Sequence, residues 1–429
     1  MSKINIFWFR RDLRLDDNTA LTQALKQKEN VLSIFIFDKE ILSKLTDKKD
    51  KRVDYFHQAL KSIDDELKKH GSSLKTYFEK PIDAFKQIIE EFDVEAVFYN
   101  RDYEPNAIKR DDEIKNFLEK NNIEVFNFKD QVIFENDEIV KNDGLPYTVY
   151  TPYSKKWKEA FTLEKIKDEK NNYSNLYKNN TYQVLSLKEI GFEKTEIEFK
   201  NPELSKELIE NYNKTRDFPA LDATTRLGVA LRFGTISVRK CVQFASEYNE
   251  TWLNDLIWRE FFTQILYHYP KVVNRSFKEK YENIEWRNNE KDFKIWCEGK
   301  TGYPLVDAGI RELNETGFMH NRVRMVVASF LTKHLLIDWR WGEAYFAEKL
   351  LDYDLSSNNG NWQWAAGCGC DAAPYFRIFN PEEQQKKFDK EYKYINKWLP
   401  KNENNPPIVE HKFARLRALE VYKKAVKDL

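Results

Sequence analysis

The sequence predicts an α/β domain built on a parallel sheet, followed by an all-α domain. In the first 130 residues, short β-rich runs alternate with charged stretches of helical periodicity, which is the pattern of strands separated by helices. From about residue 205 the pattern changes to amphipathic helices, and nine of the eleven tryptophans fall in this half. A chain of 429 residues is long enough for two such domains.

The α/β domain is expected over residues 1–130. Its candidate strands are Ile4–Phe9, Val31–Asp38, Leu74–Phe78, Ala96–Asn100 and Ile123–Phe128, and its long helices are Arg52–His70, Ile82–Glu91 and Ile108–Lys120. Near-continuous apolar strands separated by helices predict a Rossmann-like parallel sheet that is covered on both faces. No G-x-G-x-x-G follows any of these strands, so we expect a nucleotide cofactor to bind elsewhere.

Residues 131–204 are predicted to connect the two domains. Lys, Asn and Glu are frequent here, as in residues 165–180, which favours a long, solvated connection that can include short helices. The helical domain is expected over residues 205–429. Its amphipathic segments are Leu204–Asn213, Ser237–Ser246, Trp252–His268, Gly302–Thr316, Arg322–Leu336 and Glu343–Leu351.

Charge and cysteine content restrict the partners. Lys+Arg and Asp+Glu are equal at 70 each, so the net charge gives no argument for nucleic acid, although a neutral protein can carry a local basic face. Cys368 and Cys370 have no second Cys or His pair nearby in sequence to complete a metal site. No run approaches the roughly 18 apolar residues that span a bilayer. The N-terminal segment also lacks the apolar core of a signal peptide, so we expect a cytoplasmic protein.

The segment from Asn358 to Pro381 gives the strongest indication of a ligand. Trp362 and Trp364 lie among Gly and Ala and follow paired asparagines. Large π-systems beside amide groups suit an aromatic ligand, and a buried tryptophan box is the structural alternative. On a helix the two tryptophans lie about 200° apart, at roughly 100° per residue, so we expect them to have different roles.

Two other segments combine groups that could bind a ligand. Helical spacing places Asp255, Trp258 and Arg259 on one face, which fits either a binding face or a surface ion pair beside a core tryptophan. The hydroxyl-rich turn Thr224–Gly228 can offer backbone N–H groups to a phosphate, although such a turn is a weak signal by itself.

Polar groups also gather near residues 320 and 355. Asn321, Arg324 and Met325 share one helical face, which is unusual for packing, and a capped helix with an exposed arginine is the structural alternative. Asp352 and Asp354 supply acceptors that could hold ribose hydroxyls or pair with Arg324, or they are simply solvated carboxylates.

Taken together, these segments resemble the photolyase/cryptochrome family. The motifs that carry the resemblance are Trp8-Phe-Arg-Arg-Asp-Leu-Arg-Leu-Asp-Asp-Asn18, Asp255-Leu-Ile-Trp-Arg-Glu-Phe261, Gly299-Lys-Thr-Gly-Tyr-Pro-Leu-Val-Asp307 and Met319-His-Asn-Arg322, and the match continues to Trp398-Leu-Pro400. The chain is most similar to the bacterial cyclobutane pyrimidine dimer photolyases. The resemblance implies a deoxyribodipyrimidine photo-lyase, a carbon–carbon lyase that uses non-covalently bound, fully reduced FAD in its helical domain.

The resemblance also implies a role for each residue of the cofactor site. The FAD phosphates would be held by Tyr212, Thr224, Thr225, Leu227 and Gly228. The isoalloxazine would lie beside an ion pair of Arg324 and Asp352, with Arg259 and Asp354 also at the cofactor and Asn358 at flavin N5. Trp362, Trp339 and Trp296 match the tryptophan chain through which oxidised flavin is photoreduced.

The implied substrate is UV-damaged DNA with a flipped-out pyrimidine dimer. The lesion pocket would contain Asp255, Trp258, Asn321, Met325 and Trp364, and DNA would be contacted by Arg216, Arg322 and Arg377. In the (6-4) photolyases the positions of Asn321 and Met325 are characteristically histidines, so cyclobutane dimers are the expected lesion. The implied chemistry passes one electron from excited reduced flavin to the dimer and back, without a metal, in a protein expected to be a monomer.

Two departures from the family pattern affect these expectations. Asp255 replaces the usual glutamate and is one methylene shorter, which predicts repair at a lower quantum yield. The folate antenna of the family uses an Asn-Glu and a Cys-Lys pair, whereas this chain has Asn106-Ala107 and Val273-Asn274, so the antenna chromophore stays open. The alternative function is that of a cryptochrome, a blue-light flavin photoreceptor with little or no repair activity.

Overall fold

The structure, a computed structural model, describes residues 3–166, 170–179, 181–400 and 405–427 as two compact units. The first unit spans Met1–Glu135, Phe161–Leu204 and Leu227–Glu247, and the second spans Asn136–Ala160, Ser205–Arg226 and Tyr248–Leu429. The predicted connector therefore contributes to both units, and its residues 167–169 and 180 lie outside the described residues. The division at residues 130 and 204 stays a prediction.

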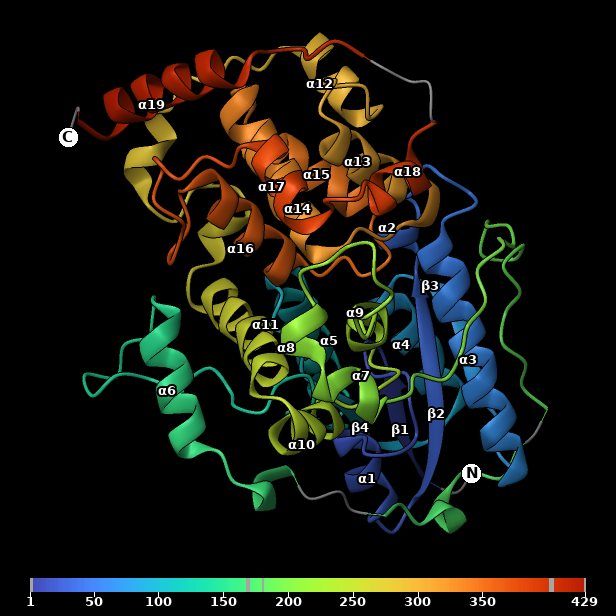
Figure 1. The fold of residues 1–429 in the computed structure, drawn as a ribbon. Coiled ribbons are helices and arrows are strands. Elements are labelled where there is room, and N and C mark those ends of the chain that lie inside the picture. Colours follow the sequence, from blue (N-terminus) through green and yellow to red (C-terminus); the bar gives the residue numbers. More distant parts are fainter. Residues whose placement is uncertain (1–2, 167–169, 180, 401–404, 428–429) are drawn as a thin grey trace. The chain divides into compact units, whose positions relative to one another are not determined.

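The first unit is built on a five-stranded parallel sheet of order β3-β2-β1-β4-β5 (Figure 1). The strands are β1 Ile4–Phe9, β2 Asn30–Asp38, β3 Lys75–Glu79, β4 Val94–Asn100 and β5 Glu124–Phe128. All five strands were predicted, and their parallel pairing is confirmed. The central strand β1 is buried at every residue because helices cover both faces of the sheet, which explains its unbroken apolar sequence.

Successive residues of β1 face opposite sides of the sheet. Phe7 and Phe9 belong to the core formed with α1 and α3, whereas Ile6 and Trp8 belong to the core formed with α4 and α5. The helices of this unit are α1 Thr19–Leu25, α2 Lys39–Leu42, α3 Lys51–Lys69, α4 Pro81–Glu91, α5 Pro105–Lys120, α9 Gly228–Phe233 and α10 Val238–Tyr248, with the 3-10 turns η1 Leu163–Ile166 and η2 Tyr173–Asn175.

Buried ion pairs attach α10 to the N-terminal segment. The Arg239 guanidinium donates to Asp17 Oδ1 and to Asp130 Oδ1, at 2.8 Å in each case, and Arg14 donates to Asp130 Oδ2 at 2.7 Å. Although burial opposes ionisation, the two arginines hold the pKa of Asp130 well below its ordinary value. Removing either arginine would leave a poorly paired buried carboxylate, so this cluster fixes which surface α10 covers.

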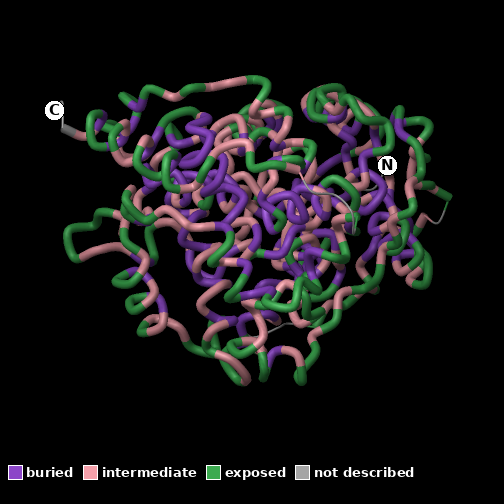
Figure 2. Tube along the Cα trace, turned by 45° about the horizontal axis from the view of Figure 1, so that its top comes forward, coloured by how far each residue is buried: buried purple, intermediate pink, exposed green. Residues whose placement is uncertain are grey.

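The second unit is helical. Its helices are α6 Tyr150–Ala160, α7 Lys206–Glu210, α8 Tyr212–Thr215, α11 Glu250–His268, α12 Glu290–Cys297, α13 Pro304–Thr316, α14 Asn321–Ser329, α15 Trp339–Lys349, α16 Leu355–Ala366, α17 Pro381–Phe388, α18 Lys393–Trp398 and α19 His411–Lys427, with the 3-10 turns η3 Pro270–Val273 and η4 Glu279–Asn283. Buried residues alternate with half-buried and exposed ones along the chain (Figure 2).

Two predicted helices differ in the structure. The segment predicted as one helix over residues 204–213 forms α7 and α8, which are separated at Asn211. The segment predicted over residues 322–336 begins as α14 and ends in a π-helical turn, η5, at Phe330–His334.

The π-helical turn buries Lys333. Its Nζ donates to the carbonyl oxygen of Ala366 at 2.8 Å and lies 3.5 Å from the centroid of the Tyr422 ring. Both contacts favour the ammonium form, whereas burial lowers the pKa of Lys333 from 10.5 to about 7. The turn thus joins the end of α16 to α19 through a single amine.

Two glycines allow close helix packing around α16. A Cβ at Gly342 of α15 would lie 2.1 Å from the Trp362 ring, and a Cβ at Gly360 of α16 would lie 2.2 Å from the Phe262 ring of α11. Any larger residue would therefore push α15 or α11 away from α16. These contacts fix the position of Trp362.

Candidate functional site

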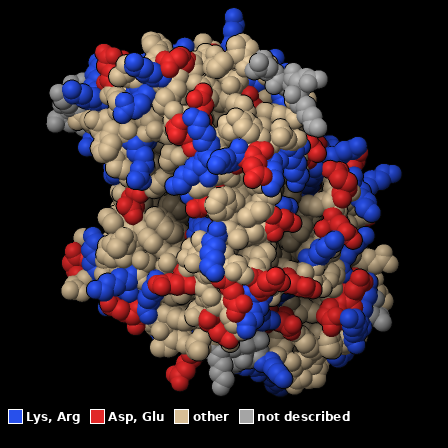
Figure 3. Space-filling model, viewed as in Figure 1, with Lys and Arg blue, Asp and Glu red and all other residues tan. Residues whose placement is uncertain are grey.

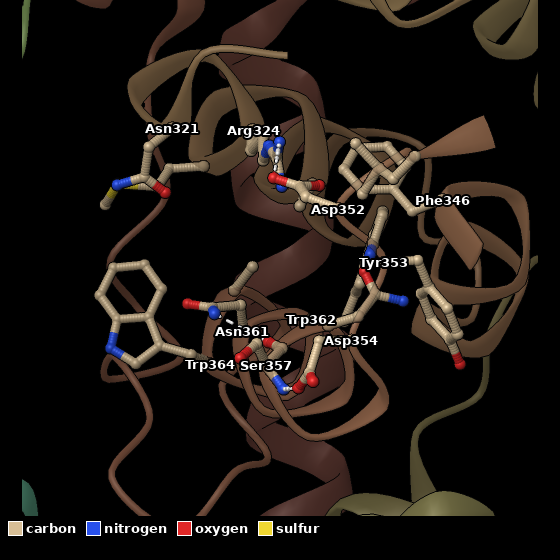
Figure 4. Close-up of a pocket in the computed structure, with 15 residues that line it drawn as sticks. Asn321, Arg324, Phe346, Asp352, Tyr353, Asp354, Ser357, Asn361, Trp362 and Trp364 are labelled. Atoms are coloured by element: carbon tan, nitrogen blue, oxygen red, sulfur yellow. Dashed lines mark hydrogen bonds and ion pairs between the residues drawn. The ribbon is translucent and has the colours of Figure 1, made fainter. Parts of the chain in front are cut away.

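A cavity in the second unit lies among α14, α15, α16 and the loop before α16 (Figure 4). It holds about 600 Å³ of space free of atoms, its open mouth included. The lining residues are Asn321, Arg324, Met325, Ala328, Phe346, Leu350, Asp352, Tyr353, Asp354, Ser357, Asn358, Asn361, Trp362, Trp364 and Ala365. The predicted flavin and lesion residues of α14, α16 and the loop are thus brought together.

An ion pair in the cavity wall joins α14 to the loop before α16. Arg324 Nη2 donates to Asp352 Oδ2 at 2.9 Å, and Arg324 Nε donates to the carbonyl oxygen of Met319 at 2.7 Å (Figure 4). Asp352 Oδ1 is buried and has no hydrogen-bond partner among the described residues. A buried acceptor in this state is costly, so a ligand N–H that reaches Asp352 Oδ1 gains a ready partner.

The amide of Asn358 is oriented by Glu343 on α15. Asn358 Nδ2 donates to Glu343 Oε1 at 2.8 Å and to the Glu343 carbonyl oxygen at 3.1 Å. Because both partners are acceptors, the amide nitrogen must face α15, which leaves the amide oxygen to accept from a ligand. Burial raises the pKa of Glu343, and the hydrogen bond from Asn358 only partly offsets this.

Asp354 begins α16. Its Oδ1 accepts from Ser356 Oγ at 2.6 Å and from the Ser357 backbone N–H at 3.2 Å, so it is the N-cap of the helix that carries both tryptophans. The helix also separates the environments of the two rings: Trp362 is buried, whereas Trp364 is half-buried and lies near Asn321 in the cavity (Figure 4).

The three tryptophans predicted for electron transfer all belong to one buried core. The Trp362 and Trp296 ring centroids lie 6.3 Å apart, and Trp339 is buried on α15. Trp296 is 0% exposed, so its ring presents no surface to a reductant in solution. Trp286 is half-buried. The next residue, Arg287, donates its backbone N–H to the carbonyl oxygen of Leu336, three residues before Trp339, at 2.8 Å.

Trp258, on α11, is stacked on Tyr150, the first residue of α6. Their ring centroids lie 3.7 Å apart and their planes differ by 6°. Tyr150 Oη donates to the Asn254 carbonyl oxygen at 2.9 Å, and the Tyr150 backbone N–H donates to Asp371 Oδ2 at 2.9 Å. One face of Trp258 is therefore occupied by this protein itself.

Asp255 is held by two donors from α8 and its C-terminus. Tyr212 Oη donates to Asp255 Oδ2 at 2.8 Å, and Arg216 Nη1 donates to Asp255 Oδ1 at 2.9 Å. Burial raises the pKa of Asp255, while Arg216 and Tyr212 oppose that effect. The predicted lesion carboxylate, a predicted DNA arginine and a predicted FAD tyrosine thus form one hydrogen-bonded group.

The other two predicted DNA arginines differ in their pairing and in their exposure to solvent. Arg322 donates from Nη2 to Asp217 Oδ1 at 2.7 Å, and its guanidinium carbon lies 4.4 Å from the Phe388 ring centroid. Arg377 is exposed in the loop after α16, where its backbone N–H donates to the Pro374 carbonyl oxygen at 2.8 Å. Of the three predicted DNA arginines, Arg377 is exposed and the other two are half-buried.

The remaining predicted cofactor residues do not line the cavity. Thr224 and Thr225 are half-buried in the second unit, whereas Leu227 and Gly228 belong to the first unit, in which Gly228 begins α9. Arg259 is half-buried on α11. The assignments of these five residues to FAD stay predictions.

Sequence reasoning missed three residues around the site. Glu343 and Trp286 gave no signal of their own, because their relevant neighbours are set by helix packing. Tyr150 did give a signal: with Tyr153 and Trp157 it forms an aromatic stripe at helical spacing inside the predicted connector.

The surface gives little further indication of a ligand class. Lys/Arg and Asp/Glu side chains are interspersed over the face shown in Figure 3. Among the described residues, no group of three or more His, Cys, Asp or Glu side chains is placed to hold a metal ion. In the same part of the chain, no helix is long and apolar enough to cross a membrane.

Comparisons with known proteins agree with this arrangement. Residues 5–171 match the family model described as DNA photolyase, and residues 252–424 match that of the FAD binding domain of DNA photolyase. The deoxyribodipyrimidine photo-lyase of Escherichia coli is 34% identical over 99% of both chains, and that of a Synechococcus species is 35% identical over 92% of this chain and 87% of its own.

A solved structure shows the same fold. The archaeal photolyase from Sulfolobus tokodaii, described with two FAD molecules, is 34% identical to this chain. It superimposes with a TM-score of 0.87 over 98% of this chain and 99% of its own. The similarity to these photo-lyases extends over nearly the whole chain at 34–35% identity, and the FAD-binding domain match includes the residues of the cavity. The chain therefore belongs to the photolyase/cryptochrome family.

Proposed function

We propose that this protein is a light-dependent deoxyribodipyrimidine photo-lyase that splits cyclobutane pyrimidine dimers in UV-damaged DNA. The observation that carries the proposal is the cavity itself. A half-buried ion pair and an oriented amide, suited to a flavin, share one cavity with Trp364, Asn321 and Met325, which offer a stacking face, an amide and a thioether to a pyrimidine dimer. The names of the relatives support the same activity.

The residues present fit an FAD. Asp352 Oδ1 is an orphaned acceptor in the cavity wall, Arg324 neutralises the same carboxylate, and the Asn358 amide oxygen is left to accept a hydrogen bond, so we assign Asn358 to flavin N5. When bound in its reduced form, FAD supplies the photoexcited electron that splits the dimer. The surrounding residues bind, orient and exclude water; no side chain here needs to act as a general base.

The lesion end would consist of Trp364, Asn321 and Met325, which line the cavity, and of Trp258, which is not among the lining residues, with the two tryptophans as stacking surfaces. Aromatic faces hold flipped-out bases by stacking, which is worth roughly 1–3 kcal/mol per base. An amide and a thioether cannot serve as proton donors at neutral pH, which favours the cyclobutane dimer over the (6-4) photoproduct.

DNA would be held by Arg216, Arg322 and Arg377, and the protein would act as a monomer in the cytoplasm. Arg216 and Arg322 are already paired with Asp255 and Asp217, so DNA phosphates must compete with those carboxylates. The affinity of the protein for DNA is therefore expected to fall clearly as the salt concentration rises.

Oxidised cofactor would be reduced through Trp362, Trp339 and Trp296. Because Trp296 is fully buried, we add half-buried Trp286 as the residue through which this group meets solvent. The backbone hydrogen bond between Arg287 and Leu336 supports that addition, because it joins the residue after Trp286 to the chain three residues before Trp339.

One observation favours the cryptochrome-like alternative. Both oxygens of Asp255 are already engaged by Tyr212 and Arg216, so the shorter carboxylate has less capacity for the dimer than a glutamate. Under the repair proposal, Asp255→Glu raises the yield of dimers split per absorbed photon. An unchanged or lower yield contradicts the role given to the missing methylene.

Dimer loss under illumination tests the proposal. The reduced protein is mixed with DNA that contains cyclobutane dimers and, separately, with DNA that contains (6-4) photoproducts, and both are exposed to blue or near-UV light. We expect light-dependent loss of the dimers and none of the (6-4) photoproducts. No dimer loss in light would leave the photoreceptor as the better function. Measuring the repair yield at wavelengths that reduced FAD absorbs and at wavelengths that it does not absorb then tests for an antenna chromophore.

A further inference from the structure

The helix α6, in the region predicted as a solvated connector, is firmly docked on α11. Trp157 Nε1 donates to Glu260 Oε1 at 2.6 Å, Tyr153 Oη donates to the same atom at 3.3 Å, and all three side chains are buried. Tyr150 lies one turn earlier on the same face of α6. The position of its ring is therefore set by a buried anchor and not by a flexible linker.

The stacking of Tyr150 on Trp258 is closer and flatter than aromatic pairs adopt by themselves. Such pairs prefer offset or edge-to-face arrangements, with centroids about 4.5–7 Å apart, over a face-to-face sandwich. Here the centroids are 3.7 Å apart and the planes are 6° from parallel. The hydrogen bonds of Tyr150 to Asn254 and Asp371, together with the docking of α6, hold the two rings in this geometry.

Two more aromatic rings contact Trp258. Phe261 meets its edge at 83°, with centroids 5.5 Å apart, and Phe262 is tilted by 35° at 5.3 Å. Half-buried Trp258 therefore has one large face covered by Tyr150 and further ring contacts with Phe261 and Phe262, and its plane cannot rotate without displacing Tyr150. The contact with Asp371 also ties Tyr150 to the loop that carries Arg377.

We propose that Tyr150 is a positioning residue for lesion recognition: it fixes the plane of Trp258, so that the opposite face of that ring is presented, already ordered, to the flipped-out dimer. This inference rests on the proposed function. Its physical basis is that binding orders a mobile side chain at a cost, and that cost is avoided when the ring is already immobilised.

The test compares Tyr150→Leu, which removes the stacking ring, with Tyr150→Phe, which keeps it. Tyr147→Leu is the matched control, because Tyr147 lies in the same segment, with its ring 6.4 Å from that of Tyr153, and is half-buried. For Tyr150→Leu we expect the affinity for dimer-containing DNA to fall by roughly 2- to 10-fold, the equivalent of ordering one side chain. Affinity for undamaged DNA, FAD content and the repair rate at saturating DNA should stay within about 2-fold of the unmodified protein.

The inference is overturned if Tyr150→Leu binds the dimer as tightly as the unmodified protein. It is also overturned if that variant loses FAD and undamaged-DNA affinity in proportion, because the role is then only structural. If the unmodified protein binds dimers preferentially but does not split them in light, the proposed function fails while the comparison of affinities still tests Tyr150.

A structure of the unmodified protein with dimer-containing DNA gives a second test that does not depend on the folding of a variant. We expect Tyr150 to stay stacked on Trp258 with the dimer on the opposite ring face. A base inserted between the two rings would show instead that Tyr150 occupies the lesion's place in the free protein, and the inference would be wrong.

Discussion

The hydrogen bond from Tyr212 to Asp255 gives a prediction whose size follows from the geometry. The 2.8 Å contact is to a carboxylate, and hydrogen bonds to charged groups contribute about 1.5–3 kcal/mol when buried. The side chain of Asp255 is 32% exposed, so water competes for its oxygens. We therefore expect this hydrogen bond to stabilise the folded protein by only about 1 kcal/mol. This interaction energy should appear as coupling between Tyr212→Phe and Asp255→Ala.

The assay is a double-mutant cycle on the free energy of unfolding in urea. The unmodified protein, the two single variants and the double variant are unfolded at the same FAD concentration, because bound ligand stabilises by mass action and must cancel in the cycle. We expect Asp255→Ala to cost about 2 kcal/mol, since it also removes the partner of Arg216, and Tyr212→Phe to cost about 1 kcal/mol. The double variant should then be about 1 kcal/mol more stable than the sum of the single effects indicates.

Two results would refute this reasoning. Additivity within about 0.3 kcal/mol would show that the hydroxyl does not act on Asp255. Loss of FAD from Tyr212→Phe, with no coupling, would show that the hydroxyl serves the cofactor, as the family resemblance implies. Equal urea dependence of all four proteins is the control that their unfolding can be compared.

Three other predictions concern Glu343, Trp286 and Lys333. Glu343→Ala removes the side-chain acceptor of the Asn358 amide and keeps the backbone acceptor, so reduced FAD should reoxidise in air about 2- to 10-fold faster, the value of one hydrogen bond, whereas Glu343→Gln should behave like the unmodified protein; equal rates in all three would be contrary evidence. Trp286→Phe should slow photoreduction of FAD by an external reductant more than Trp296→Phe does, and the reverse order would exclude Trp286 as the surface residue. Lys333 has a folded pKa of about 7 against an ordinary 10.5, so stability should rise with pH between these values by up to about 1.4 kcal/mol per unit and be lost as pH falls towards 7; urea unfolding of Lys333→Met should lack that slope, and identical slopes would contradict the assignment.

The sheet could be predicted from the sequence because each strand carries its own signal. In β1, Ile6 and Trp8 alternate with Phe7 and Phe9, and both sets are buried by helices, so the apolar run is unbroken and short. The long helices were predictable for the same local reason. Asn211 and the π-helical turn at Phe330 were missed because they depend on how the helices pack, which a periodic pattern does not contain.

The site was predictable where a motif is contiguous and was not where packing makes it. Asn358, Trp362 and Trp364 lie on one helix and were found together, with their division into a buried and a half-buried ring expected from helical spacing. Glu343 reaches Asn358 only because α15 packs against α16 at Gly342. Tyr150 reaches Trp258 only because α6 docks on α11, and its position in a polar connector concealed its role.

The central claim is that light drives a redox-neutral splitting of the dimer, and counting turnovers tests it most directly. Fully reduced protein with a known amount of bound FAD is illuminated with excess dimer-containing DNA under anaerobic conditions, and both the dimers split and the reductant consumed are measured. We expect many dimers split per FAD in light, none in the dark, and no stoichiometric consumption of reductant. No splitting in light, or one reducing equivalent consumed for each dimer, would contradict it.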